Sequence, residues 1–150
     1  MLEMKQKDEK NQLKRSLKIS KKDAEELISG NYEVLLNYKE DFAIECYSVM
    51  NMYLYKPKSI VQYCRKAYVI PENEIRITFD YDIKSTESNF DIFSNELVLN
   101  KILDDTNVVL EVKYNNFLLD YIKDILQMVN KSEISVSKYC LSRNSILNYM

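Results

Sequence analysis

One stretch of the chain decides the fold: residues 58–80 read KSIVQYCRKAYVIPENEIRITFD. Residues 58–69 and 74–80 are rich in Ile, Val, Tyr, Phe and Thr, which favour strands. The residues between them, Pro71-Glu-Asn73, are typical of a turn. The stretch therefore predicts two antiparallel strands joined by a short connection.

Side chains alternate across a strand, so residues two apart share a face. Each predicted strand then has an apolar face and a face that carries charged or hydrogen-bonding groups. The polar faces hold Glu3 and Lys5, Tyr63 and Arg65, Arg76 with Thr78 and Asp80, and Glu111 with Lys113.

Two interpretations of these polar faces remain open. In a one-sided antiparallel sheet they simply lie in water and form exposed cross-strand pairs. Alternatively, they line a closed or nearly closed barrel whose apolar faces are covered by helices. Such a lining suits a polyanion held with a divalent metal, because cations neutralise phosphate oxygens and carboxylates hold the metal.

The segments on either side supply helices and further strands. Ser20 and Asp23 approximate a capping box, and Gly30, the only glycine, lies where a helix needs a left-handed end. Residues 134–150 are ambiguous. The other expected elements are a hairpin within 1–19 with its turn over 7–11, helices over 20–30, 39–53 and 117–129, a loop over 82–105 and a strand over 107–114.

Composition removes several kinds of active site. The 150 residues include one Gly and no His, and the net charge is −2. A glycine-rich dinucleotide turn, a P-loop, a Ser-His-Asp triad and an H-E-x-x-H zinc site are therefore impossible. Any catalysis must use Lys, Arg, Asp, Glu, Tyr, Ser or a bound metal ion.

The same composition sets expectations about the environment. The chain has no run of 18 apolar residues, its three cysteines are widely spaced, and its charge gives no general attraction to nucleic acid. We therefore expect a cytoplasmic protein with reduced thiols, no membrane segment and no nucleic-acid partner.

Five motifs follow one another along the chain: KPKSIVQYCRKAY (56–68), IRITFD (75–80), VLEVKY (109–114), FLLDYI (117–122) and SKY (137–139). This ordered set resembles the VTC domain, the polyphosphate polymerase type of the triphosphate tunnel metalloenzyme superfamily. The resemblance implies an α+β fold, in which an antiparallel β tunnel, here partial, has helices packed on its outside.

The resemblance also implies an activity, the transfer of the terminal phosphate of ATP to a polyphosphate chain with a divalent metal, Mn²⁺ or Mg²⁺. Such chemistry depends on positioning and charge neutralisation more than on proton transfer, so a chain without His can support it. The implied residues are Arg65, Arg76 and Lys138 for catalysis, Lys5, Tyr63, Lys113 and Ser137 for phosphate, Glu111 for the metal, and Glu3, Lys14, Arg15 and Lys58 in support.

One departure from the resembled family concerns the start of the chain. A complete domain of that family begins well before the strand that carries Glu3 and Lys5. We therefore expect residues 1–150 to be the C-terminal part of a single tunnel domain, to which another chain or segment supplies the missing strands. The alternative is a non-catalytic module that binds polyphosphate or a nucleotide and regulates another subunit.

Overall fold

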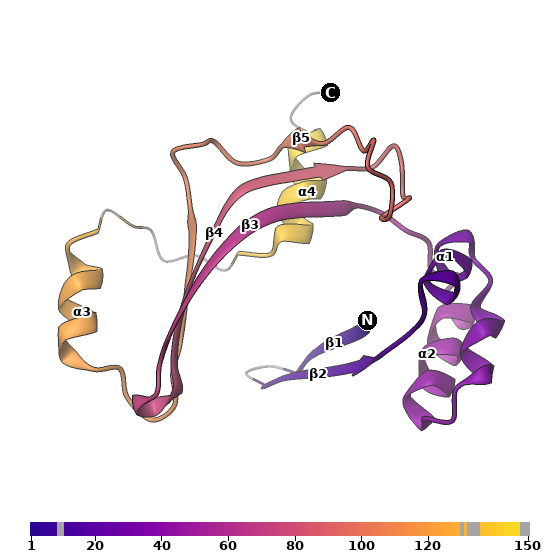
Figure 1. Cartoon of the computed structure of the whole chain (residues 1–150), viewed down its shortest axis with the longest axis horizontal. Coiled ribbons are helices and arrows are strands. Elements are labelled where there is room, and N and C mark those ends of the chain that lie inside the picture. Colours follow the sequence, from indigo (N-terminus) through magenta and orange to yellow (C-terminus); the bar gives the residue numbers. More distant parts are fainter. Residues whose placement is uncertain (9–10, 130, 132–135, 148–150) are drawn as a thin grey trace. The chain divides into compact units, whose positions relative to one another are not determined.

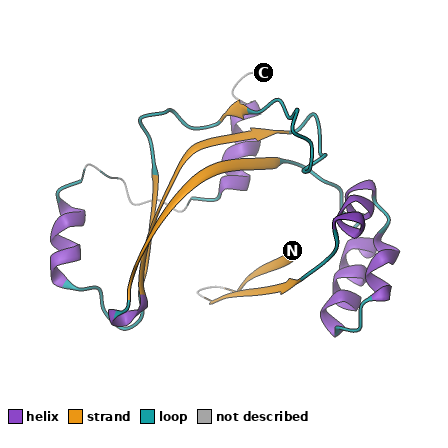
Figure 2. Ribbon diagram, viewed as in Figure 1, coloured by secondary structure: helices purple, strands orange, loops and turns teal. Residues whose placement is uncertain are grey.

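The computed structural model describes residues 1–8, 11–129, 131 and 136–147. Its contacts divide the chain into two compact units, residues 1–58 with 90–94 and residues 59–89 with 95–150, which we call the first and second units. Each unit combines helices with antiparallel strand pairs (Figures 1 and 2), so the α+β class is confirmed.

The first unit begins with the predicted hairpin. Strand β1 (Leu2–Asp8) pairs antiparallel with β2 (Asn11–Leu17); residues 9–10 of the expected turn lie outside the described residues. Helix α1 (Lys21–Ser29) follows, and its N-cap Ser20 accepts a hydrogen bond at 3.0 Å from the backbone of Asp23. Gly30 ends the helix at φ 97°, so both predicted helix signals are confirmed.

A small core holds the first unit together. The short 3₁₀ helix η1 (Tyr32–Asn37), which the sequence did not predict, leads into α2 (Asp41–Met52). The buried side chains come from β2, α1, η1 and α2, so every element after the first strand contributes. They are Leu17, Leu27, Leu35, Ala43 and Cys46.

The second unit is built on a long hairpin. Strand β3 (Ile60–Ile70) turns through η2 (Glu72–Glu74) into β4 (Ile75–Thr86), as the sequence predicted. The other edge of β4 pairs antiparallel with β5 (Asn100–Lys101) and with β6 (Val109–Lys113). Figures 1 and 2 show β3 and β4 bending together, and a register shift between Gln62 and Cys64 marks a bulge of the kind that bends paired strands.

The predicted loop over 82–105 is wrong at its start, where β4 continues to Thr86, and at Asn100–Lys101, where β5 interrupts it. Asp82 has a φ of 49°, which interrupts the alternation that the sequence pattern relies on. Immediately before it the even-numbered Thr78 and Asp80 are buried, whereas immediately beyond it the odd-numbered Ile83 and Ser85 are buried; Ile75 and Thr86, at the two ends of the strand, are buried as well. The strand thus continues past Asp82, but the side chains that are buried shift from even-numbered to odd-numbered positions.

Two helices complete the second unit. Helix α3 (Asp120–Gln127) is shorter than the predicted 117–129. Helix α4 (Lys138–Leu147) lies in the ambiguous tail, of which residues 134, 135 and 148–150 are outside the described part, and it contacts β3 and β4. Within the described residues the sheets remain open and no closed barrel forms.

Among the residues that the structure describes, no helix combines the length and the apolar composition needed to cross a membrane.

Two neighbouring leucines of η1 test the core of the first unit. Leu35 is fully buried and Leu36 is about half exposed. We expect Leu35→Ala to lower the free energy of unfolding by about 2–5 kcal/mol, because it leaves a cavity. Leu36→Ala should change it by no more than about 0.5 kcal/mol. Urea unfolding followed by circular dichroism measures both, and equal losses would contradict this core assignment.

Candidate functional site

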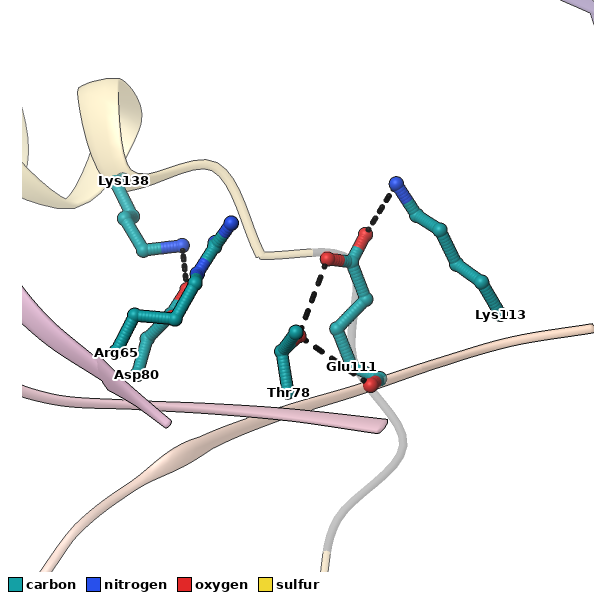
Figure 3. A network of polar contacts seen from close by, with 6 residues as sticks. All are labelled: Arg65, Thr78, Asp80, Glu111, Lys113 and Lys138. Carbon is teal, nitrogen blue, oxygen red and sulfur yellow. Dashed lines mark hydrogen bonds and ion pairs between the residues drawn. The ribbon is translucent and has the colours of Figure 1, made fainter. Parts of the chain in front are cut away.

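The connection between β3 and β4 sets which residues of the two strands face each other. Ile70 lies opposite Ile75, so five residues further from the turn Arg65 lies opposite Asp80. The guanidinium of Arg65 donates two hydrogen bonds to the carboxylate of Asp80, from Nε to Oδ1 at 2.6 Å and from Nη2 to Oδ2 at 2.8 Å (Figure 3). This two-pronged geometry is the strongest form of an arginine–carboxylate pair.

Helix α4 brings a second cation to the same carboxylate. Lys138 begins the helix, and its Nζ lies 2.5 Å from Asp80 Oδ2. Ser137 precedes it, and its Oγ accepts a hydrogen bond at 3.3 Å from the backbone of Cys140, so Ser137 helps to start the helix that carries Lys138. We call Arg65, Asp80 and Lys138 the Asp80 cluster.

Burial and charge define the state of this cluster. The side chain of Asp80 is 1% exposed, whereas those of Arg65 and Lys138 are 35% and 23% exposed. The hydrogen bond from Arg65, together with that from Lys138, holds the pKa of Asp80 below its ordinary value although burial raises it. The same bond to Asp80 raises the pKa of Arg65. Asp80 is therefore ionised at neutral pH, and two cationic side chains share its single negative charge.

An aromatic ring lies beside both cations. The centroid of the Tyr63 ring is 5.2 Å from Cζ of Arg65 and 4.7 Å from Nζ of Lys138. At these distances the ring attracts each cation and limits where its side chain can move. The structure therefore brings together three of the predicted site residues, Tyr63, Arg65 and Lys138.

A second polar group lies further along β4. Thr78 is opposite Glu111 of β6, and its Oγ1 lies 3.5 Å from Oε2 of Glu111. The other oxygen of that carboxylate, Oε1, is 3.2 Å from Nζ of Lys113. In Figure 3 these side chains project from the same side of the strands as the Asp80 cluster, so the predicted polar face is present.

Arg76 is placed differently from Arg65. It lies opposite Lys113 in the pairing of β4 with β6, and alternation puts it on the face of Thr78 and Asp80. Its side chain is exposed, and no described carboxylate forms an ion pair with it. Arg76 and Lys113 thus form a positive area that has no buried carboxylate such as Asp80; Lys113 has the exposed Glu111 beside it.

The predicted metal ligand can be tested against the geometry. The described residues contain no group of three or more His, Cys, Asp or Glu side chains that could hold a metal ion. Glu111 is an exposed carboxylate beside one cation. Mg²⁺ is often bound through one or two carboxylates with substrate phosphates and water. Glu111 therefore fits as one ligand of an ion that is also bound by phosphate.

The remaining predicted residues lie in the first unit. Glu3 of β1 pairs with Lys14 of β2 at 2.6 Å, and the hydrogen bond from Lys14 lowers the pKa of Glu3. Lys5 lies opposite Lys14 in the hairpin, so two lysines flank one carboxylate.

Arg15 and Lys58 have contrasting surroundings in the first unit. The Nη1 of Arg15 lies 2.5 Å from Oε2 of Glu45 in α2, and its guanidinium lies over the ring of Phe42, 4.9 Å from the centroid. Arg15 therefore attaches the hairpin to α2 and has a structural role that its prediction as a supporting cation did not include. Lys58 is exposed at the end of this unit.

Asp80 is the residue of the site that the sequence-based prediction missed. The pattern placed Asp80 on the polar face but assigned it no role. The signal was available, because a hairpin that turns at Pro71–Glu74 pairs Arg65 with Asp80 by counting outward from the turn. The contact of Lys138 with Asp80 had no such signal, since α4 is far away in the sequence.

Comparison with known proteins gives one match. The family model described as the VTC domain matches residues 1–147. No curated protein and no solved structure matches the chain.

Acid should remove the contribution of Asp80 to stability. Because folding lowers the pKa of Asp80, its contribution is present above the unfolded value of about 4 and is lost as pH falls through the lower folded value. We expect Asp80→Asn to reduce the free energy of unfolding by about 1–3 kcal/mol at pH 7, and by much less near pH 2. Urea unfolding at the two pH values measures this difference.

The matched control is Asp82→Asn on the same strand. Asp82 pairs with Lys84 at 2.8 Å but is partly exposed, and its positive φ suits Asn. This change should cost less than about 1 kcal/mol at either pH. A loss for Asp80→Asn that is the same at pH 7 and pH 2 would contradict the assigned charge state.

Proposed function

Because this chain belongs to the VTC domain family, we propose that it binds ATP and polyphosphate and serves the metal-dependent transfer of the terminal phosphate of ATP to a polyphosphate chain. The observation that carries this proposal is one face of the sheet, where Arg65 of β3 and Lys138 of α4 share the buried carboxylate of Asp80 and the strands also carry Arg76, Lys113 and Glu111. Such a face suits a linear anion with many phosphate oxygens.

The chemistry of phosphoryl transfer agrees with these residue types. Its transition state needs alignment of the reacting groups and neutralisation of charge on the transferring phosphate. The guanidinium of Arg65 can bind phosphate oxygens in a fixed plane, whereas Lys138 and Lys113 supply point charges. A divalent ion, Mn²⁺ or Mg²⁺, would neutralise neighbouring phosphates when bound, and we assign Glu111 as its protein ligand.

The open edge of β3 supports a further part of the proposal. Among the described residues β3 pairs with β4 alone, so its other edge presents backbone donors and acceptors. We propose that a further strand, from this or another chain, pairs there and extends the polar face toward the tunnel that the sequence predicts.

A second candidate is a non-catalytic module that binds polyphosphate or a nucleotide. The observation that favours it is the Asp80 cluster itself, because its two cations are already partly neutralised by one carboxylate. Incubation with ATP and Mn²⁺ or Mg²⁺, followed by measurement of polyphosphate, separates the two candidates. Product supports the polymerase, and binding of inorganic tripolyphosphate without product supports the module.

Charge reversal at Arg76 tests the assigned face under both candidates. Arg76 is exposed and unpaired with any described carboxylate, so Arg76→Glu should leave the fold intact. We expect its affinity for inorganic tripolyphosphate to fall at least about tenfold, as loss of a charge-assisted contact predicts. Calorimetric titration measures the affinity.

Lys66→Glu is the control for this reversal. Lys66 follows Arg65 on β3, so its side chain points to the opposite face, and it is also exposed. Its reversal changes the net charge equally and should weaken binding only slightly. Equal losses for the two variants would show that binding depends on overall charge and not on the proposed face.

A further inference from the structure

We propose that Asp80 is a positioning residue, which holds Arg65 and Lys138 where they contact the phosphate oxygens of the bound anion. This inference rests on the proposed function and adds a role for a residue that does not itself touch the phosphate. Its basis is the contact geometry of the Asp80 cluster.

The contacts leave each cation with donors to spare. Arg65 uses Nε and Nη2 for Asp80, so its Nη1 remains available, and Lys138 has three N–H groups, of which Asp80 needs one. In Figure 3 the ammonium of Lys138 points to the Asp80 carboxylate, and one end of the Arg65 guanidinium extends past it. The contacts that hold the two cations therefore leave N–H donors on each of them free to bind phosphate oxygens.

Burial makes Asp80 suited to hold the cations and unsuited to act on the anion directly. It is 1% exposed, and both of its oxygens accept hydrogen bonds from the cluster. Arg and Lys side chains lose considerable rotational freedom when a ligand orders them. Here Asp80 and the ring of Tyr63 restrict both side chains before binding, which reduces that loss.

Asp80 also weakens the positive charge that attracts the anion, so its two effects have opposite signs. Removing its charge makes the local charge more positive, which offsets the rotational freedom that Arg65 and Lys138 regain and so maintains or strengthens binding of the free anion. Removing its hydrogen-bonding geometry releases Arg65 and Lys138, which slows the transfer step that needs them aligned. A purely structural residue would not separate binding from turnover in this way.

The decisive experiment compares Asp80→Asn with Asp82→Asn, each checked for folding by circular dichroism. The dissociation constant for inorganic tripolyphosphate and the kcat of polyphosphate synthesis are measured for both. For Asp80→Asn we expect a dissociation constant that is equal or lower and a kcat reduced about 100-fold, the effect of a misplacement of about 1 Å. Asp82→Asn should match the original protein. With turnover by the original protein, a rise in kcat for Asp80→Asn, or the same kcat in the two variants, would overturn the proposal.

A second measurement on the original protein does not need turnover. We expect the Nε–H of Arg65 to exchange slowly with water in nitrogen-15 NMR spectra without ligand, and rapidly in Asp80→Asn. Rapid exchange in the original protein would overturn the positioning role. Slow exchange there, with neither product nor tripolyphosphate binding, would contradict the proposed function while the hold of Asp80 on Arg65 stands.

Discussion

The ionised carboxylate of Asp80 is the constraint on which the second unit depends. A carboxylate taken out of water is costly unless cations and hydrogen bonds replace its hydration. Arg65 comes from β3 and Lys138 from α4, so the burial of Asp80 in β4 requires the hairpin register and the position of the helix at once. The Asp80 cluster therefore connects β3, β4 and α4, of which the helix lies far from the two strands in the chain.

This constraint divides the cations of the polar face into two kinds. Arg65 and Lys138 are held by a buried acid, whereas Arg76 is exposed and free of any described carboxylate, and Lys113 has only the exposed Glu111 beside it. Held cations bind an anion with little loss of side-chain freedom but with reduced charge, and free cations do the opposite. A face that combines both kinds can orient one part of a long polyanion while attracting the rest.

The parts of the fold that follow from local rules could be predicted from the sequence. Ser20 and Gly30 bound α1 because the cap and the left-handed end depend only on neighbouring backbone groups. The β3–β4 turn follows in the same way from Pro71 and the residues after it. The end of β4 could not be predicted, because Asp82 shifts the alternation and pairing with β3 maintains the strand beyond it.

The sequence by itself determined the residue types of the candidate site, the strands that carry them and, through the VTC motifs, the family. Only the tertiary structure decided that Lys138 joins Arg65 on Asp80, that Ser137 starts the helix which brings Lys138 there, and that Arg15 binds Glu45. The physical reason is the distance along the chain over which each interaction acts. Periodicity and capping act over a few residues, whereas a buried charge is satisfied by whichever cation the folded chain brings within hydrogen-bonding distance.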